Sequence, residues 1–388
     1  MTGASGTYDP RFAALADLLH ARVEDGTERG ASLCVIQDGE VLVDIWDGWF
    51  DRESTVPWER DTITPVWSTT KAMTNLAALV LVDRGQLDLD SPVATYWPEF
   101  AAAGKDRVTL AHLLGHTSGV PGWDQPVTVD DLYDWDRSTA MLAAQAPWWE
   151  PGTASGYHLL NQGHLVGEVV RRVTGVTLGQ FFAKDVAGPL EADFHIGLDP
   201  SDDDRVSPLT TPRRPDADLP DDPSGIALRT FTAPFLPAKE ANTARWRRAE
   251  LPALNGHGNA RSVARIQALI SHGGEVDGVR LLSEQTIERI FDVQASGTDL
   301  VLGVPVTFGT GWALPSPGSM PSVASGRRCY WGGLGGSVVV NDLDRRLTVA
   351  YAMNRMVLET VPGTRLARPC GDSRSDAYLA AIESALLA

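Results

Sequence analysis

Apolar residues recur at helical spacing near the start of the chain, at Phe12, Leu15, Leu18, Leu19 and Val23. This period predicts an amphipathic helix over 12–23. The following run, 32–46, is rich in β-branched and apolar residues on both sides of Asp38-Gly39, a dipeptide typical of tight hairpin turns. The chain is therefore expected to begin with a helix followed by two paired strands.

The C-terminal part of the chain has a similar pattern. Two β-rich runs, 329–340 and 347–354, flank the polar segment 342–345, and 376–387 has the spacing of a terminal amphipathic helix. Between the two ends the apolar residues mostly follow a helical period, over 71–84, 109–114, 129–145, 161–174 and 178–186. The pattern predicts an α/β sheet built from both ends of the chain, with a mostly helical insertion between them.

We therefore expect two domains. Residues 1–63 and 250–388 are predicted to form the sheet domain, and 64–249 the mostly helical domain. Within the latter, 199–224 is rich in Asp and Pro, which favours an exposed, flexible excursion or a lid over a core element.

Charge and composition exclude several classes of function. Among 388 residues, 50 acidic and 33 basic side chains give a formal net charge of −17, which repels nucleic acids and anionic membrane surfaces. The chain starts without a secretory pattern, and no stretch approaches the roughly eighteen apolar residues of a membrane span. These features predict a soluble cytoplasmic protein with neither nucleic-acid nor membrane partners, and they do not determine its oligomeric state.

Metal binding and disulfides are not expected. Cys34, Cys329 and Cys370 are an odd, scattered set, typical of reduced structural thiols. His112 and His116 have the spacing of two zinc ligands on a helix, but the glutamate of a His-Glu-x-x-His motif is missing. A hydrogen-bonded structural role for His116 is the better interpretation.

The first candidate for chemistry is the pair Ser68 and Lys71. Residues three apart share one face of a helix, so the hydroxyl and the amine can meet there. Burial beside apolar neighbours would lower the pKa of the lysine and make it a base for the serine, and a helix N-terminus at Ser68 would favour a developing oxyanion. The alternative is a helix start with Ser68 as N-cap and Lys71 on the solvated face.

Three segments in order carry a family resemblance. Segment 66–74 (VWSTTKAMT), segment 85–93 (GQLDLDSPV) and segment 113–120 (LLGHTSGV) resemble the nucleophile region and later motifs of class C β-lactamases and the β-lactamase-like esterases. The resemblance implies the fold shared by β-lactamases and penicillin-binding proteins. In that fold an antiparallel sheet flanked by helices packs beside a mostly helical second domain, with the active site between them.

The resemblance also suggests the other catalytic groups. Segment 151–157 (PGTASGY) is similar to the stretch whose tyrosine shuttles protons beside the nucleophile, which assigns that role to Tyr157, and a nearby lysine charge would pull its phenol toward phenolate. The Trp-Gly-Gly sequence 331–333 resembles the third motif. By this resemblance the amides of Leu334 and Ser68 form an oxyanion hole, each donor being worth roughly 3 kcal/mol of barrier. A tyrosine that anchors a loop and a glycine-rich turn between strands are the structural alternatives.

Departures from the family pattern indicate the substrate. Class C β-lactamases carry Lys-Thr-Gly and Tyr-x-Asn, where this chain has Trp331-Gly332-Gly333 and Tyr157-His158-Leu159. An indole in place of the lysine removes a charged contact to an anionic substrate and adds apolar surface, as in the family VIII carboxylesterases. The residues expected to contact substrate are Trp331, Gly332, Gly333, Leu159, Trp123 and Trp149.

The sequence thus predicts a serine carboxylesterase for short- to medium-chain hydrophobic esters, working through an acyl-enzyme on Ser68. An amide hydrolase of the same fold, acting on β-lactams, D-amino-acid peptides or linear oligoamides, is the second hypothesis, and a penicillin-binding protein without turnover is the third. No cofactor or metal is needed, and a small-molecule ester is the only partner expected. His257 is predicted to lie in a strained turn near the active site, without an assigned role.

Overall fold

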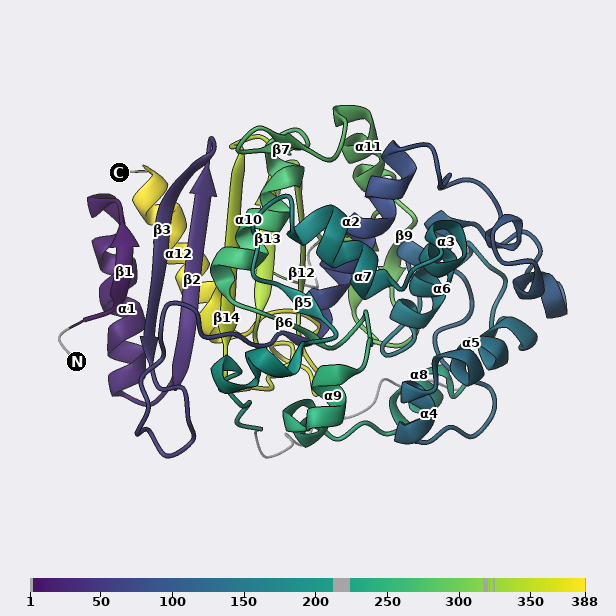
Figure 1. The fold of residues 1–388 in the computed structure, drawn as a ribbon, viewed down its shortest axis with the longest axis horizontal. Helices are drawn as coiled ribbons and strands as arrows, with labels where there is room; N and C mark the ends of the chain where they lie inside the picture. Colours follow the sequence, from purple (N-terminus) through teal and green to yellow (C-terminus); the bar gives the residue numbers. More distant parts are fainter. Residues whose placement is uncertain (1–2, 212–223, 317–319, 321, 324, 388) are drawn as a thin grey trace.

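The structure, a computed structural model, describes residues 3–211, 224–316, 320, 322–323 and 325–387. Within these ranges the main sheet has nine antiparallel strands in the order β1-β3-β2-β14-β13-β12-β11-β10-β9 (Figure 1). The strands are β1 Ser5–Tyr8, β2 Gly30–Gln37, β3 Glu40–Gly48, β9 Ala295–Thr298, β10 Pro305–Phe308, β11 Ala313–Leu314, β12 Arg328–Gly332, β13 Val338–Asp342 and β14 Leu347–Met353. Both ends of the chain therefore build one sheet, and β2 pairs directly with β14.

The first hairpin forms where the sequence predicts it. Asp38 and Gly39 connect β2 to β3 with φ angles of 50° and 84°, the left-handed pair that a two-residue hairpin turn requires. The run 329–340 differs from the expectation of a single strand, because it divides into β12 and β13 around a turn at 333–337. That turn lies beside the predicted nucleophile.

Helices cover both faces of the sheet. Helix α10 (Ala260–Ser271) packs on β2, β13 and β14, while α1 (Ala13–Glu24) packs on β3 and on α12 (Ser373–Leu387). Because both faces are covered, β14 is buried along its whole length. In Figure 1 the purple α1 and the yellow α12, from opposite ends of the sequence, lie at the same end of the molecule.

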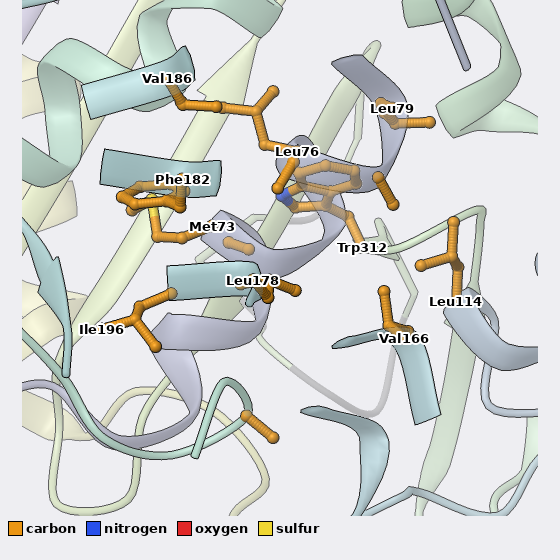
Figure 2. Close-up of a cluster of buried hydrophobic side chains, with 14 of the residues drawn as sticks. Met73, Leu76, Leu79, Leu114, Val166, Leu178, Phe182, Val186, Ile196 and Trp312 are labelled. Carbon is orange, nitrogen blue, oxygen red and sulfur yellow. The ribbon is translucent and has the colours of Figure 1, made fainter. Parts of the chain in front are cut away.

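The helical part of the chain packs around α2. Figure 2 shows apolar side chains of α2 (Thr70–Asp83) surrounded by side chains from neighbouring helices and by Trp312. Every residue of α2 from 70 to 81 is buried, as expected of a helix that is enclosed on all sides. Of the helices in this part, α6 Gln162–Thr174 and α7 Leu178–Phe182 pack on α2, α3 Leu110–Leu114 and α5 Trp135–Ala144 pack on α6, and α4 Val129–Tyr133 packs on α5.

The expected single helix over 129–145 is broken into α4 and α5. Asp134 lies between them with extended backbone angles, and its carboxylate accepts a hydrogen bond from Arg137 N at 3.0 Å as the N-cap of α5. Of the helices in the described ranges, none is long and apolar enough to cross a bilayer.

Short elements link the helical part to the sheet. A small sheet in the order β4-β6-β5 joins Thr64–Pro65, Gly256–Gly258 and His195–Ile196. His257 is the middle residue of β6, so the prediction of a strained turn at this histidine is wrong. The remaining short elements are α8 Ile226–Thr232, α9 Ala244–Arg248, β7 Glu275–Val276, β8 Val279–Arg280 and α11 Glu284–Glu288.

The acidic segment 199–224 is described only in part. Its first half forms a 3₁₀ turn, Pro200–Arg205, and Asp203 pairs with Arg247 at 2.7 Å and also with Arg248. This half is therefore anchored to α9. Residues 212–223, which make up nearly all of the second half of the predicted flexible excursion, lie outside the described residues. The division into two domains stays a prediction.

Candidate active site

Ser68 lies in a tight turn that enters the buried helix α2. Residues Trp67–Thr69 form a 3₁₀ turn, and α2 begins at Thr70. Trp67 has a φ of 48°, a left-handed conformation that costs a bulky residue roughly 1–2 kcal/mol. The surrounding structure holds this turn, because the Trp67 carbonyl accepts from Thr70 Oγ1 at 2.5 Å and the indole packs on Trp246. These contacts hold the strained turn and so fix the direction of the Ser68 side chain at the start of the helix.

Lys71 is buried beneath the serine. Lys71 is only 1% exposed, and its Nζ lies 3.2 Å from Ser68 Oγ. The interpretation of Lys71 as a solvated surface residue is therefore wrong. Burial alone lowers the pKa of Lys71 well below its ordinary value of 10.5, because it disfavours the charged form.

The contacts of Lys71 suit a neutral amine. Besides Ser68, Nζ contacts the carbonyl oxygens of Leu159 at 2.9 Å and Ala253 at 3.1 Å. A neutral amine has two N–H bonds and one lone pair. If the two N–H bonds donate to the carbonyls, the lone pair is left for the hydroxyl of Ser68, which is the arrangement that a general base requires.

Tyr157 and Trp331 meet beside this pair. The Tyr157 ring centroid lies 4.8 Å from Lys71 Nζ, and the indole Nε1 of Trp331 donates to the phenolic oxygen at 3.1 Å. The Ser68 hydroxyl lies near enough to the phenol to lower the pKa of Tyr157. The structure thus brings together Ser68, Lys71, Tyr157 and Trp331. That the indole holds the phenolic oxygen was not foreseen from the sequence, since it needs β12 to lie beside the loop that carries Tyr157.

The protonation of Tyr157 differs from the expectation of a phenolate. Burial raises the pKa of Tyr157 above its ordinary value of 10.0, although hydrogen bonds from Ser68 and Trp331 partly oppose the rise. Lys71 is not among the groups that lower the pKa of the phenol, and burial disfavours the charged form of its amine. The phenol of Tyr157 is therefore protonated near pH 7 and available as a proton donor, while the lowered pKa of Lys71 favours the amine as the base.

Asp299 holds the backbone of Tyr157. One buried carboxylate oxygen, Oδ1, accepts from the N–H groups of Tyr157 at 3.0 Å, Val301 at 2.9 Å and Leu302 at 2.9 Å. Burial raises the pKa of Asp299, and these backbone hydrogen bonds oppose the rise. Asp299 is a positioning residue that the sequence analysis missed, because nothing near 299 in the sequence marks a partner 142 residues away.

The turn at 333–337 packs directly on the nucleophile turn. Ser337 Oγ donates to the carbonyl of Val66 at 2.9 Å, and a side chain at Gly333 would lie 2.0 Å from that same oxygen. At Gly332 it would meet Cys370 Sγ at 2.7 Å. Both glycines are therefore required by contacts within the protein, a reason different from the close approach of substrate expected from the sequence.

Leu334 is the exposed residue of this turn, with 44% of its surface accessible. In the described part of the chain neither its N–H nor that of Ser68 donates to another group. Two amides without partners therefore lie on two turns that contact one another, and the assignment of an oxyanion hole to them stays a prediction.

The other residues expected to contact substrate divide into two groups. Leu159 and Trp149 are half-buried and pack on the same apolar cluster as Tyr157 and Trp331. Trp123 does not: it is 1% exposed, lies in the core around α2, and its indole donates to Ser138 O at 3.2 Å. The assignment of Trp123 to the substrate pocket is corrected accordingly, because its ring is enclosed by helices.

The histidines near the site have structural contacts. His116 packs edge-on against Tyr157, with ring centroids 4.8 Å apart, and its Nδ1 accepts from His158 N at 3.2 Å. His112 instead belongs to the capping box of α3 with Thr109. The two histidines spaced like zinc ligands thus have separate partners, and the structural role expected for His116 is confirmed. In the described ranges no group of three or more potential ligands could hold a metal ion.

The cysteines are buried and free, as predicted. Burial raises the pKa of both Cys329 and Cys370 to about 12, which makes these thiols unreactive.

Comparisons with known proteins agree with this geometry. The β-lactamase family model matches residues 15–368. The chain belongs to the β-lactamase family. It is 34% identical to the esterase/β-lactamase LipL of Mycobacterium tuberculosis, over 91% of this chain and 83% of that protein. The chain is thus a serine hydrolase of the β-lactamase family. The name of this relative shows that the family includes proteins described with more than one activity.

Two solved structures resemble this family member along almost its whole length. A family VIII carboxylesterase is 38% identical, with a TM-score of 0.89 and 99% of both chains covered. A penicillin-binding protein homologue from Caulobacter crescentus is 35% identical, also with a TM-score of 0.89, over 99% of this chain and 100% of that one. The likeness confirms the predicted fold and the kinship with the esterase branch of the family.

Proposed function

We propose that this protein is a carboxylesterase that hydrolyses short- to medium-chain hydrophobic esters through an acyl-enzyme on Ser68. The observation that carries the proposal is the contact of Ser68 with a buried Lys71, whose pKa burial lowers, beside a phenol held by Trp331. A neutral amine can accept the proton of a serine hydroxyl, which an ammonium cannot.

In the proposed first step the Ser68 proton passes to the lone pair of Lys71 Nζ as Oγ bonds to the ester carbonyl carbon. The electron pair of the carbonyl moves to its oxygen, which the N–H groups of Ser68 and Leu334 stabilise. Collapse of this intermediate breaks the bond to the alkoxide, which leaves with the phenolic proton of Tyr157, and Tyr157 recovers a proton from Lys71. Water then attacks the acyl-enzyme by the same route in reverse.

The environment of the site supports an uncharged substrate. Trp331 stands where a β-lactamase lysine would contact an anionic group, and in the described residues Tyr157 and Trp331 belong to a cluster of apolar side chains. These include Phe308, Ile226, Phe231, Leu159 and Trp149. Apolar surroundings of this kind favour alkyl and acyl chains over a carboxylate, because a buried anion without a cation is destabilised. A small-molecule ester is accordingly the partner proposed.

Hydrolysis of amides is the second candidate. The name of the Mycobacterium tuberculosis relative combines esterase and β-lactamase, so one site of this kind is described with both activities. The group that leaves from an amide needs a proton before it departs, and the neutral phenol of Tyr157 could supply it.

The test is steady-state hydrolysis of p-nitrophenyl butyrate beside a chromogenic cephalosporin, with the Ser68→Ala variant as blank. We expect ester turnover that the variant abolishes, with little cleavage of the lactam. Faster cleavage of the cephalosporin would make the amide hydrolase the leading hypothesis. A burst of one equivalent without further turnover would indicate a penicillin-binding protein, and full ester activity in the Ser68→Ala variant would reject the assignment of the nucleophile.

A further inference from the structure

A buried ion cluster lies behind the turn that carries Leu334. It consists of Glu28, Arg374 and Asp372, each with a side chain at most 1% exposed. Arg374 Nη1 lies 2.9 Å from Glu28 Oε2, and Arg374 Nη2 lies 2.6 Å from Asp372 Oδ2. The cluster joins the beginning of the chain to the first turn of α12, far in sequence from any motif of the active site.

All five N–H donors of the Arg374 guanidinium are used. Nη1 donates to Glu28 and to the carbonyl of Arg355 at 2.9 Å, while Nε and one N–H of Nη2 donate to Asp372. The second N–H of Nη2 donates to the carbonyl of Gly335 at 2.8 Å. A lysine has only three donors from one atom and could not make these contacts together.

The contact with Gly335 connects the ion cluster to the oxyanion turn. Gly335 directly follows Leu334, and its carbonyl also accepts from Val357 N at 3.0 Å. At Gly336, with a φ of 129°, a side chain would lie 2.4 Å from Asp372 Oδ2 and 2.6 Å from Arg374 Nη2. The cluster therefore rests directly on the backbone of the turn.

The opposite side of the same turn contacts the nucleophile segment. Ser337 Oγ bonds both the carbonyl of Val66 and the hydroxyl of Thr69, each at 2.9 Å. The turn at 333–337 is thus held between Ser68 and its neighbours on one side and the guanidinium on the other. Moving the guanidinium would free one side of the turn and shift the amide of Leu334 relative to the amide of Ser68.

We propose that Arg374, fixed by Glu28 and Asp372, is a positioning residue that sets the oxyanion hole by holding the Gly335 carbonyl. The inference rests on the proposed function, because it assigns the Leu334 amide to the oxyanion. An oxyanion forms in the transition states and not in bound substrate. Its positioning therefore affects kcat and leaves KM nearly unchanged.

The test compares wild-type protein with the Arg374→Lys and Asp372→Asn variants, using p-nitrophenyl butyrate and an alkylboronic acid. The boronic acid adds to a serine as a tetrahedral anion and so reports on the oxyanion hole directly. We expect kcat to fall about 10- to 100-fold in Arg374→Lys, since displacing a catalytic group by about 1 Å has effects of this size. KM should change less than about twofold, and affinity for the boronic acid should fall in parallel with kcat.

Glu383→Gln is the matched control. Glu383 also lies on α12 and pairs with Arg328 at 3.0 Å, but it does not contact the turn. We expect this variant to lower the melting temperature while kcat stays at the wild-type value. Equal kcat in Arg374→Lys and wild type, with only a lower melting temperature, would overturn the proposal.

Asp372→Asn decides the question if Arg374→Lys does not fold. It preserves the volume of the side chain and the guanidinium, and we expect a smaller loss of kcat with the same unchanged KM. Unchanged kcat in a folded Asp372→Asn variant would then overturn the proposal. Failure of the proposed function is a separate outcome, because it appears as activity that survives Ser68→Ala.

Discussion

The hydrogen bond between Trp331 and Tyr157 allows a test that separates stability from catalysis. Both side chains are buried, and Trp331 Nε1 donates to the phenolic oxygen at 3.1 Å. Tyr157→Phe removes the acceptor and leaves the indole N–H buried without a partner. An unsatisfied buried donor costs about 1–3 kcal/mol, so we expect the free energy of unfolding to fall by that amount.

The double variant Tyr157→Phe/Trp331→Phe removes both partners. Because no unsatisfied donor remains, its loss of stability should be smaller than the sum of the two single losses, by about 1–2 kcal/mol. The single variant Trp331→Phe measures the stability lost through the smaller ring at 331, so that loss cancels when the double variant is compared with the sum of the two single variants. Activity should behave differently: kcat should fall about 10²–10⁴-fold in Tyr157→Phe and stay low in the double variant, because the proton donor is gone.

Urea unfolding followed by circular dichroism gives the stabilities, and hydrolysis of p-nitrophenyl butyrate gives the rates. Tyr133→Phe is the control, since it removes a phenol that donates to Glu240 at 2.8 Å outside the site. It should lower stability and leave kcat unchanged. Strictly additive losses in the double variant, or a Tyr157→Phe variant as stable as wild type, would refute the reasoning from the hydrogen bond.

Four further predictions concern buried groups. Lys71→Arg should lower kcat about 10²–10⁴-fold, because a guanidinium does not lose its proton and cannot act as base. Lys71 binds fewer protons in the folded than in the unfolded protein because burial lowers its pKa, so the free energy of unfolding of the wild type should rise with pH up to the ordinary pKa of 10.5. In urea unfolding, the Lys71→Met variant should therefore exceed the wild type in stability by an amount that shrinks as the pH rises over that range. A difference that grows with pH would contradict a depressed pKa. Asp299→Ala leaves three backbone N–H groups unpaired, so the free energy of unfolding should fall by about 3 kcal/mol and kcat should fall as well. Asp299→Asn keeps an accepting oxygen and should lose less stability. Equal losses of the two variants in urea unfolding would argue against the role of Asp299 as acceptor for these N–H groups. Trp123→Phe should lower stability by about 1–3 kcal/mol and leave the ratio of kcat/KM between acetate and octanoate esters unchanged; a changed ratio would return Trp123 to the pocket.

Local features of the fold were readable from the sequence. The helix near residue 12, the hairpin at Asp38-Gly39 and the helix at the C-terminus follow from the period of apolar residues and from turn chemistry. The prediction of one helix over 129–145 was wrong because the cap at Asp134 outweighed the apolar period. The assignment of Trp123 to the pocket was wrong because a sequence pattern does not say which face of an enclosed element is turned to the site. The turn predicted at His257 was wrong because this segment becomes a strand only by pairing with β4 and β5, which are distant in the sequence.

The sequence by itself determined the family, the mixed fold and the four residues that meet at the site, because a short motif in its own segment carries the chemistry of each group. Only the tertiary structure decided how those groups work. The burial of Lys71 lowers its pKa, the indole of Trp331 holds Tyr157, and Arg374 contacts the turn behind Leu334. Each of these depends on the burial or contact of residues far apart in the chain, and packing in three dimensions alone creates that environment.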